Sequence, residues 1–129
     1  MAHDVYDFVD NRGRSVIGSW IAEEKLGRRE VGVLNSKIDV LEVSGPDLAP
    51  GLLKGPINKE RHIYKLVIHA GRMLRPMLCK GPFEMDTEFT LLLGALEKDG
   101  KLSVGASKAT ANREILLADR NRRMKHERY

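Results

Sequence analysis

Polar and apolar residues alternate along the stretch 61–80, and the alternation predicts two β-strands joined by a short turn at Ala70-Gly71. Period-two alternation with β-branched and aromatic residues is typical of strands, and Gly71 supplies the positive φ that a tight turn requires. In the second strand, 73–80, Pro76 lacks an N–H group and predicts a bulge or an unpaired edge position. In the first strand, one face carries His62, Tyr64, Leu66 and Ile68, and the other carries Ile63, Lys65, Val67 and His69.

Two segments before this hairpin show helical spacing. Ser15 is a suitable N-cap for a helix from Val16 to about Leu26. Trp20 is expected to pack this helix onto the rest of the protein; stacking on a nucleic-acid base is the alternative. After Gly27, apolar residues recur every three or four positions, at Val31, Leu34, Ile38 and Leu41. The two segments predict a helical hairpin laid against a sheet; a partner-binding coiled coil is the alternative, although two heptads are too few to support it.

Further segments complete the expected order of elements. Residues 4–10 are predicted as a first strand, and residues 44–56 as a loop because they contain three Gly/Pro breaker pairs. Leu48, Leu52 and Leu53 are expected to pin this loop to the core. The near-continuous apolar run 88–96 predicts a central strand buried on both faces. After a charged turn at 97–101, a helix is predicted at 107–123, with an apolar stripe of Ala111, Ile115 and Ala118 that Leu116 and Leu117 widen.

The length of 129 residues is enough for one domain, 1–129, with its own core, and the order of elements puts this domain in the α+β class. Cys79 is the only cysteine, so no internal disulfide is expected and a reducing compartment fits. No apolar run approaches the roughly 20 residues of a transmembrane helix, and the first residues lack the pattern of a secretory signal. We therefore expect a cytoplasmic protein without a membrane partner.

Positive charge is concentrated in two places along the chain. The formal net charge is +4. In the stretch 51–82, only Glu60 opposes the cations Lys54, Lys59, Arg61, Lys65, Arg72, Arg75 and Lys80. The second cluster is a basic tail at about 120–129, which is expected to fray at the end of the last helix, where cations favour the helix dipole. Such clustering favours binding of a polyanion; a solubilising surface is the alternative.

The sequence lacks the motifs of several common enzyme classes. It has no Cys/His cluster at metal-ligand spacing, no phosphate-binding glycine loop and no Gly-x-Ser-x-Gly motif, so no metal and no cofactor are expected. The basic hairpin remains as the concentrated chemistry. RNA carries its own nucleophile, the 2′-hydroxyl, so a protein can cleave it by orienting this hydroxyl, removing its proton and neutralising the phosphate. Arg can bind two phosphate oxygens, and Lys serves as a point charge or as a base.

The candidate residues for this chemistry lie on the two strands of the hairpin. Lys65 and His69 share a strand face by parity. Arg72 and Arg75 join them on one substrate if both strands present their cations to the same side. The alternative is that these side chains are solvated charges that protect a sheet from edge pairing.

Several short patterns appear in a fixed order along the chain. They are Ile63-Tyr64-Lys65-Leu66, Gly71, Arg75, Phe89 to Leu93, Lys98, and Asn112-Arg113-Glu114-Ile115 with Ala118. With the order of elements, they resemble the RelE/ParE superfamily of type II toxins over roughly residues 4–123, most closely its phage-derived HigB-like branch. The resemblance implies a small, strongly curved, mostly antiparallel sheet with an N-terminal helical hairpin and a C-terminal helix.

The resemblance also implies a function. RelE- and HigB-type toxins cleave mRNA on the ribosome without a metal, by attack of a 2′-hydroxyl on the adjacent phosphate. A cognate antitoxin, often a helix-turn-helix protein, neutralises them. By position, Lys65 matches a functional basic residue, Arg75 the arginine at the scissile phosphate, and Lys98 a basic residue after the fourth strand; these are the candidate catalytic residues. The candidate RNA-binding residues are Arg61, His69, Arg72 and Lys80.

The chain departs from the family pattern at several points: Met77-Leu78-Cys79 replaces the usual aromatic-rich strand, and the loop from Gly81 to Thr87 is long. Pro76 directly follows Arg75, and no tyrosine follows Lys98 to stack on a base. The alternatives to an endoribonuclease are a non-catalytic module of the same fold that uses its basic surface to bind nucleic acid or protein, and a gyrase-directed toxin of the ParE type. The codon preference, the identity of the antitoxin and the oligomeric state stay open at this point.

Overall fold

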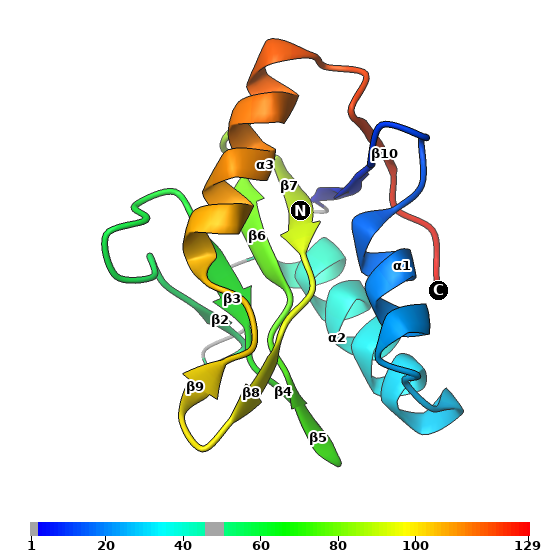
Figure 1. Ribbon diagram of the computed structural model, residues 1–129. Helices are drawn as coiled ribbons and strands as arrows, with labels where there is room; N and C mark the ends of the chain where they lie inside the picture. Colours follow the sequence, from blue (N-terminus) through cyan, green and yellow to red (C-terminus); the bar gives the residue numbers. More distant parts are fainter. Residues whose placement is uncertain (1–2, 46–50) are drawn as a thin grey trace.

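A computed structural model describes residues 3–45 and 51–129. This part of the chain forms an α+β fold, as the sequence predicts, with two N-terminal helices and one C-terminal helix (Figure 1). The helices are α1 (Val16–Glu23), α2 (Arg28–Ser44) and α3 (Ala106–Ala118). The strands are β1 (Asp4–Phe8), β2 (Leu53–Lys54), β3 (Tyr64–Leu66), β4 (Ile68–Ala70), β5 (Arg72–Leu74), β6 (Met77–Lys80), β7 (Glu88–Leu93), β8 (Leu96–Lys98), β9 (Lys101–Leu102) and β10 (Arg123–Lys125). None of the helices in this part is both long and apolar enough to span a membrane.

The main sheet has the strand order β10-β1-β7-β6-β3-β2. Only the pair β1 and β7 is parallel; the other neighbours are antiparallel. All six residues of β7 are buried, which confirms the predicted central strand. A strand with a helix layer on each face buries both sets of side chains, and this explains the unbroken apolar run that precedes Gly94.

The predicted basic hairpin is confirmed, but it is divided between two sheets. Its outer parts, β3 and β6, pair within the main sheet, and its inner parts, β4 and β5, pair in a small sheet of order β4-β5-β8-β9. The break falls at Val67 on one strand and at Arg75-Pro76 on the other. Pro76 has no N–H to donate, although its carbonyl still accepts from Leu66 N at 2.9 Å. A bulge follows between Met77 and Leu78, as Pro76 predicts.

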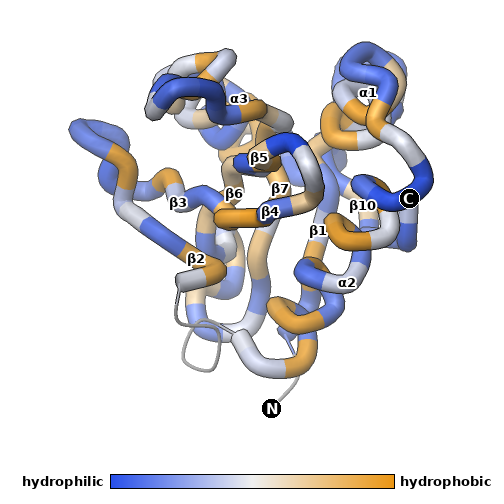
Figure 2. Tube along the Cα trace, turned by 90° about the horizontal axis from the view of Figure 1, so that it is seen from below, coloured by the Kyte–Doolittle hydropathy of each residue, from blue (hydrophilic) through white to orange (hydrophobic). Residues whose placement is uncertain are grey.

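The two N-terminal helices predicted from apolar spacing are confirmed, and their apolar positions face the sheet. Ser15 caps α1 by accepting a hydrogen bond from Gly18 N, and Trp20 is buried in the core. In α2, the inward side chains are Leu34, Asn35, Ile38 and Leu41. Seen from below (Figure 2), the β4–β5 hairpin lies between α3 on one side and α1 with α2 on the other. The core is therefore double: α1 and α2 pack on one face of the main sheet and α3 packs on the other.

The loop expected at 44–56 is only partly a loop. The helix α2 continues to Ser44 and the short strand β2 begins at Leu53. Leu52 is buried and Leu53 packs against the core, as expected. Leu48, together with most of the breaker pairs, lies outside the residues that the structure describes.

The prediction for α3 is wrong in its face and in its length. Ala111 and Ala118 are exposed and Ile115 is 40% exposed, whereas the buried positions are Ala106, Ala109 and Leu116. Polar side chains on the inward face find partners there: Asn112 Nδ2 donates to Leu92 O at 2.8 Å, and Thr110 Oγ1 to Glu60 at 3.1 Å. A polar residue can occupy an inward position when it bonds the neighbouring strand. Such residues interrupt the apolar pattern, so the sequence does not reveal which face of α3 is buried.

The basic tail at 120–129 does not continue the helix or fray, contrary to the prediction. The helix ends at Ala118, and β10 pairs antiparallel with β1 along the edge of the main sheet. Arg123 Nη1 donates to the buried Glu88 carboxylate at 2.8 Å, and its guanidinium lies 3.8 Å from the Tyr6 ring centre. Lys125 bonds Asp4 at 2.6 Å. The cations of this segment therefore have partners inside the protein, and they hold a strand rather than form a free polyanion-binding tail.

Candidate functional site

The small sheet presents one apolar and one polar face. Strand register aligns His69 with Met73, and Met73 with Glu97, across β4, β5 and β8. Side chains alternate between the two faces of a strand. The intervening residues therefore point the other way, into the core beside α2; they are Ile68, Leu74 and Leu96. The outward face, formed by Lys65, His69, Met73 and Glu97, with the buried Arg75 beneath Glu97, is called the polar face below.

Glu97 brings together the first two predicted catalytic residues. Lys65 Nζ lies 3.6 Å from Glu97 Oε1, and Arg75 Nη2 lies 3.4 Å from Glu97 Oε2. The exposed fractions of the Lys65 and Glu97 side chains are 25% and 24%. Burial acts to raise the pKa of the Glu97 carboxyl, but the charges and hydrogen bonds of Arg75 and Lys65 together outweigh it and leave that pKa lowered. The carboxylate is therefore ionised at neutral pH.

Arg75 faces inward from this cluster. Its side chain is only 6% exposed, and its Nη1 donates to the carbonyls of Leu74 at 3.0 Å and Ile68 at 3.3 Å. These bonds fall at the break between the two sheets, where the backbone of β4 and β5 leaves carbonyl groups to satisfy. The contact between Arg75 and a substrate phosphate stays a prediction, and in this conformation the guanidinium serves the hairpin and Glu97.

Arg72 points to the opposite side of the hairpin. Parity separates it from Met73, and its guanidinium bonds both carboxylate oxygens of Glu30 at 2.8 Å. It also reaches the Glu24 carbonyl at the end of α1, at 3.1 Å. The structure thus does not bring Arg72 together with Lys65 and His69 on one face. Its predicted contact with RNA stays a prediction, while its observed contacts tie the hairpin tip to the corner between α1 and α2.

A cavity of about 430 Å³ lies at the hairpin tip and includes one further predicted residue, Lys98. It is lined by Gly71, Arg72, Met73, Leu96, Glu97, Lys98 and Asp99. Lys98 is exposed, at the end of β8. His69 is exposed on β4, with Nδ1 2.8 Å from Met73 Sδ. Lys65 and Arg75 thus meet Glu97 at this end of the hairpin, and His69 lies on the same face of the small sheet, whereas Lys98 alternates to the opposite face of β8.

Arg61 and Lys80 lie at the other end of the hairpin, at its base. Lys80 Nζ lies 5.1 Å from the Tyr64 ring centre, which is a cation–π geometry. Arg61 is exposed beside His62, and burial, followed by the charges of Arg113 and Arg61, lowers the pKa of His62. The structure therefore does not group these two predicted RNA-binding residues with the cluster around Glu97.

Sequence reasoning missed the acidic member of the cluster. The sequence predicts only a charged turn at Glu97, yet this residue belongs to β8 and pairs with Met73. Its position next to Lys98 gives no local signal, because its partners Lys65 and Arg75 lie 32 and 22 positions earlier in the chain. Glu30 is different: Gly27-x-x-Glu30 matches a capping box, and Gly27 N does donate to Glu30 Oε1 at 3.0 Å.

A second polar cluster is buried between β1, α1 and the end of the chain. The Asp7 carboxylate accepts hydrogen bonds from Ser15 Oγ at 2.6 Å and Tyr129 Oη at 2.7 Å, and it lies 2.9 Å from His126 Nδ1. The side chains of Asp7 and His126 are 1% and 2% exposed. Asn35 on α2 bonds the backbone of Tyr129 through both atoms of its amide. This cluster holds the last strand in place.

Within 3–45 and 51–129, no three His, Cys, Asp or Glu side chains lie close enough to hold a metal ion. Comparison of the chain with protein-family models, with curated proteins and with solved structures finds no match.

Proposed function

We propose that this protein is the toxin of a type II toxin–antitoxin pair, and that it inhibits translation by cleaving mRNA on the ribosome. The observation that carries the proposal is the convergence of Lys65 and Arg75 on the ionised Glu97 carboxylate, with His69 on the same face of the small sheet. The order of elements, a strand, two helices, a meander and a helix, also agrees with the resemblance in the sequence. A cytoplasmic location belongs to the same proposal.

The proposed reaction uses groups of the polar face. The Glu97 carboxylate accepts the proton of the 2′-hydroxyl, the 2′-oxygen attacks the adjacent phosphorus, and the bond to the 5′-oxygen breaks. His69 gives a proton to the leaving 5′-oxygen. The ammonium group of Lys65 neutralises the charge that develops on the phosphate. Arg75 positions Glu97 and the hairpin. The products are a 2′,3′-cyclic phosphate and a 5′-hydroxyl.

The cognate antitoxin of this proposal covers the polar face and is co-encoded with the toxin. Because Lys65, His69 and Lys98 are cationic or become so on protonation, an acidic segment is the complementary surface. Co-expression of the neighbouring open reading frame should then restore growth in cells that express the wild-type chain.

Translation in living cells tests the proposal. Methionine incorporation is followed after tightly controlled induction of wild type, Lys65→Ala and Glu97→Gln, and the 5′ ends of the mRNA are mapped in the same cells. Wild type should stop incorporation and produce new 5′-hydroxyl ends. Each variant should reduce the rate of cleavage by about 100-fold or more, which is the usual scale for loss of an acid–base group or a charge stabiliser.

Lys37→Ala is the matched control, because Lys37 is an exposed cation on α2, away from the polar face. It should arrest translation as wild type does, at equal soluble expression. Continued incorporation with wild type would rule out the nuclease. Damaged DNA in cells that continue translation would instead favour the gyrase-directed toxin. If Lys65→Ala and Glu97→Gln both arrest translation as fully as wild type, the polar face is not the source of the toxicity.

A further inference from the structure

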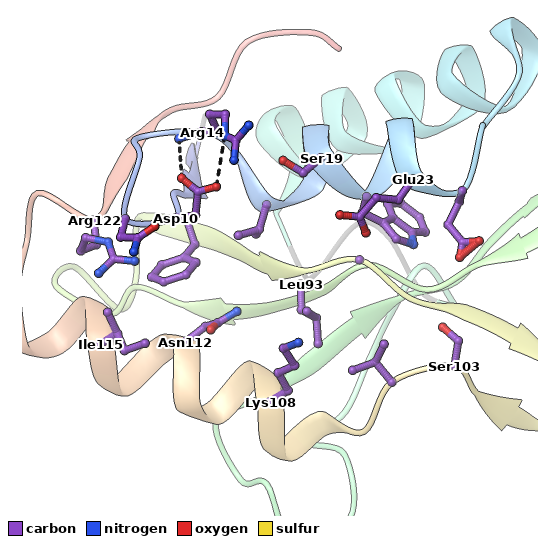
Figure 3. Close-up of a pocket in the computed structure, with 17 residues that line it drawn as sticks. Asp10, Arg14, Ser19, Glu23, Leu93, Ser103, Lys108, Asn112, Ile115 and Arg122 are labelled. Carbon is purple, nitrogen blue, oxygen red and sulfur yellow. Dashed lines mark hydrogen bonds and ion pairs between the residues drawn. The ribbon is translucent and has the colours of Figure 1, made fainter.

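A second and larger cavity, of about 730 Å³, lies between α1 and α3, at the edge of β7 that does not pair with β6. Figure 3 shows Ser19 and Glu23 of α1 on one side of it and Lys108, Asn112 and Ile115 of α3 on the other. Leu93 of β7 lies between the two helices. This cavity is called the helix groove below. Its volume lies within the range of ligand-binding clefts, and none of the residues predicted from the sequence as a site lines it.

The floor of the helix groove is an open strand edge. The neighbouring strand β1 pairs with β7 only as far as Asp7 with Leu91. Beyond Phe8 the chain turns away, so the edge of β7 has no strand beside it from Leu93 onward. On the opposite edge, Leu93 pairs with Met77, and the Ala95 carbonyl accepts from Arg75 N at 2.8 Å.

Gly94 therefore directs its backbone groups into the groove, because alternate residues of a strand bond to opposite neighbours. It is buried and lines the groove, yet neither its N–H nor its C=O has a hydrogen-bond partner anywhere in 3–45 or 51–129. Buried backbone groups are nearly always paired. A donor and an acceptor on one residue that no group of the described chain pairs are available to a group from outside the chain.

The two residues on either side along the same edge are already paired. The Leu92 carbonyl accepts from Asn112 Nδ2 at 2.8 Å. Leu96 N donates to Ser103 Oγ at 2.9 Å, and Leu96 O accepts from Ser103 N at 2.8 Å. The open edge is thus one residue long, because Asn112 of α3 completes it on one side of Gly94 and Ser103 completes it on the other.

Trp20 lines the same groove beside Gly94. Its side chain is buried, with 7% of the residue exposed, and Nε1 has no hydrogen-bond partner in the described part of the chain. The indole ring lies directly against Gly94, because a Cβ atom on Gly94 would lie 2.1 Å from it. The strand edge at Gly94 and the indole ring therefore lie side by side in the groove.

We propose that the helix groove binds an extended peptide segment of a partner protein, which adds one strand to β7 by exchanging two hydrogen bonds with Gly94. A residue of an extended chain offers one N–H and one C=O on the same side, the complement of what Gly94 presents. The proposal does not depend on the RNA chemistry of the polar face.

The two helices set the chemistry of the bound segment. Successive side chains of a strand point to opposite faces of its sheet, and here those faces are covered by α1 and α3. The α1 wall carries Glu23 and Glu24, whereas the α3 wall carries Lys108, and no ion pair engages these three among the described residues. The segment should therefore alternate, with basic residues toward α1 and acidic residues toward α3.

The experiment uses random peptides displayed on phage as the probe, selected on the full chain and then synthesised. Trp20 is the only tryptophan, so its fluorescence reports directly on the groove. Selected peptides should change this fluorescence and show the alternating charges. Ile115→Arg should weaken their binding at least about tenfold, because Ile115 lines the groove. Leu117→Arg is the matched control, since Leu117 is on the same helix, 41% exposed against 40%, and outside the groove.

Main-chain pairing is then tested separately from side-chain contacts. Methylation of one peptide nitrogen at a time should cost about tenfold in affinity at the residue that pairs with Gly94, because it removes a hydrogen bond. The amide of Gly94 should exchange rapidly with solvent in the free protein and slowly in the complex, whereas the amide of Arg75, bonded to Ala95 O, stays protected in both.

Three outcomes would overturn the inference. They are a selection that yields no binding peptide, peptides that bind Ile115→Arg as tightly as wild type, and an affinity that no single N-methyl group reduces. A short RNA oligonucleotide, tested in parallel, that changes the Trp20 fluorescence when no peptide does would assign the groove to nucleic acid instead.

Discussion

Arg72, at the tip of the β4–β5 hairpin, holds Glu30 in the first turn of α2 through two hydrogen bonds of 2.8 Å. The hydrogen bond from Arg72, then that from Gly27 N, lowers the pKa of the Glu30 carboxyl from 4.5 to about 2. The contact ties the sheet that carries the polar face to the helix layer. It fixes the tip of the hairpin, and with it the floor of the cavity beside Lys98.

Arg72→Ala should lower the urea midpoint of unfolding at pH 7. The Glu30 carboxylate binds its proton less readily in the folded state than in the unfolded state, so the contact stabilises the fold above pH 4.5 and this contribution is lost as the pH falls toward 2. The difference between wild type and the variant should therefore be largest at neutral pH and shrink near pH 2. Lys101→Ala, at an exposed cation of β9, is the control and should match wild type at both pH values. A difference that is constant with pH would contradict the role of Glu30.

Tyr129→Phe should destabilise the protein by about 1–3 kcal/mol, because the buried Asp7 carboxylate loses one of its donors. Urea unfolding measures the change. Tyr6→Phe is the matched control: the Tyr6 ring stacks beneath Arg123, and its hydroxyl makes no hydrogen bond to any residue that the structure describes, so its loss should have little effect. Equal stabilities for the two variants would show that the Asp7 cluster does not hold the last strand.

Gly94→Ala should cost about 1–3 kcal/mol through overpacking, because the new Cβ would meet the Trp20 ring at 2.1 Å. The cost should fall when Trp20 is replaced by leucine, which leaves room for the methyl group, so the two substitutions should not be additive. Gly32→Ala, within α2 and with no atom inside 4 Å, should instead stabilise the protein by about 0.5–1 kcal/mol. Additive effects of Gly94→Ala and the Trp20 substitution would argue that the indole does not confine Gly94.

Cys79 should be inert in the folded protein. It is buried between β6 and α3, and burial raises the pKa of its thiol to about 11, so the reactive thiolate is scarce at pH 8. An aromatic disulfide reagent should react with it slowly in buffer and rapidly in concentrated urea. Rapid reaction in buffer would mean that α3 opens from the sheet without global unfolding.

The sequence alone sets out most of the local structure, because each element leaves a periodic signal within a few residues. Alternation around Lys65, the cap at Ser15 and the seam of Leu34, Ile38 and Leu41 each predict an element that the structure contains. The apolar run that includes Leu91 also predicts the central strand. Gly71 and Pro76 further mark the turn and the break in the hairpin, since both residues restrict the backbone by their own covalent structure.

Tertiary structure alone decides which charges meet. Lys65 and Arg75 meet Glu97, and Asp7 meets His126 and Tyr129, across separations that no local pattern reports. Tertiary structure also turns the basic tail into a strand, since β1 without β10 would leave an open edge.

The open edge at Gly94 also results from the packing of segments that are distant in the chain. It exists because β1 turns away after Phe8 while β7 continues. The sequence therefore determines what each segment can form, through sterics and side-chain period. The packing of segments distant in the chain determines which polar groups are paired and which remain open to a partner.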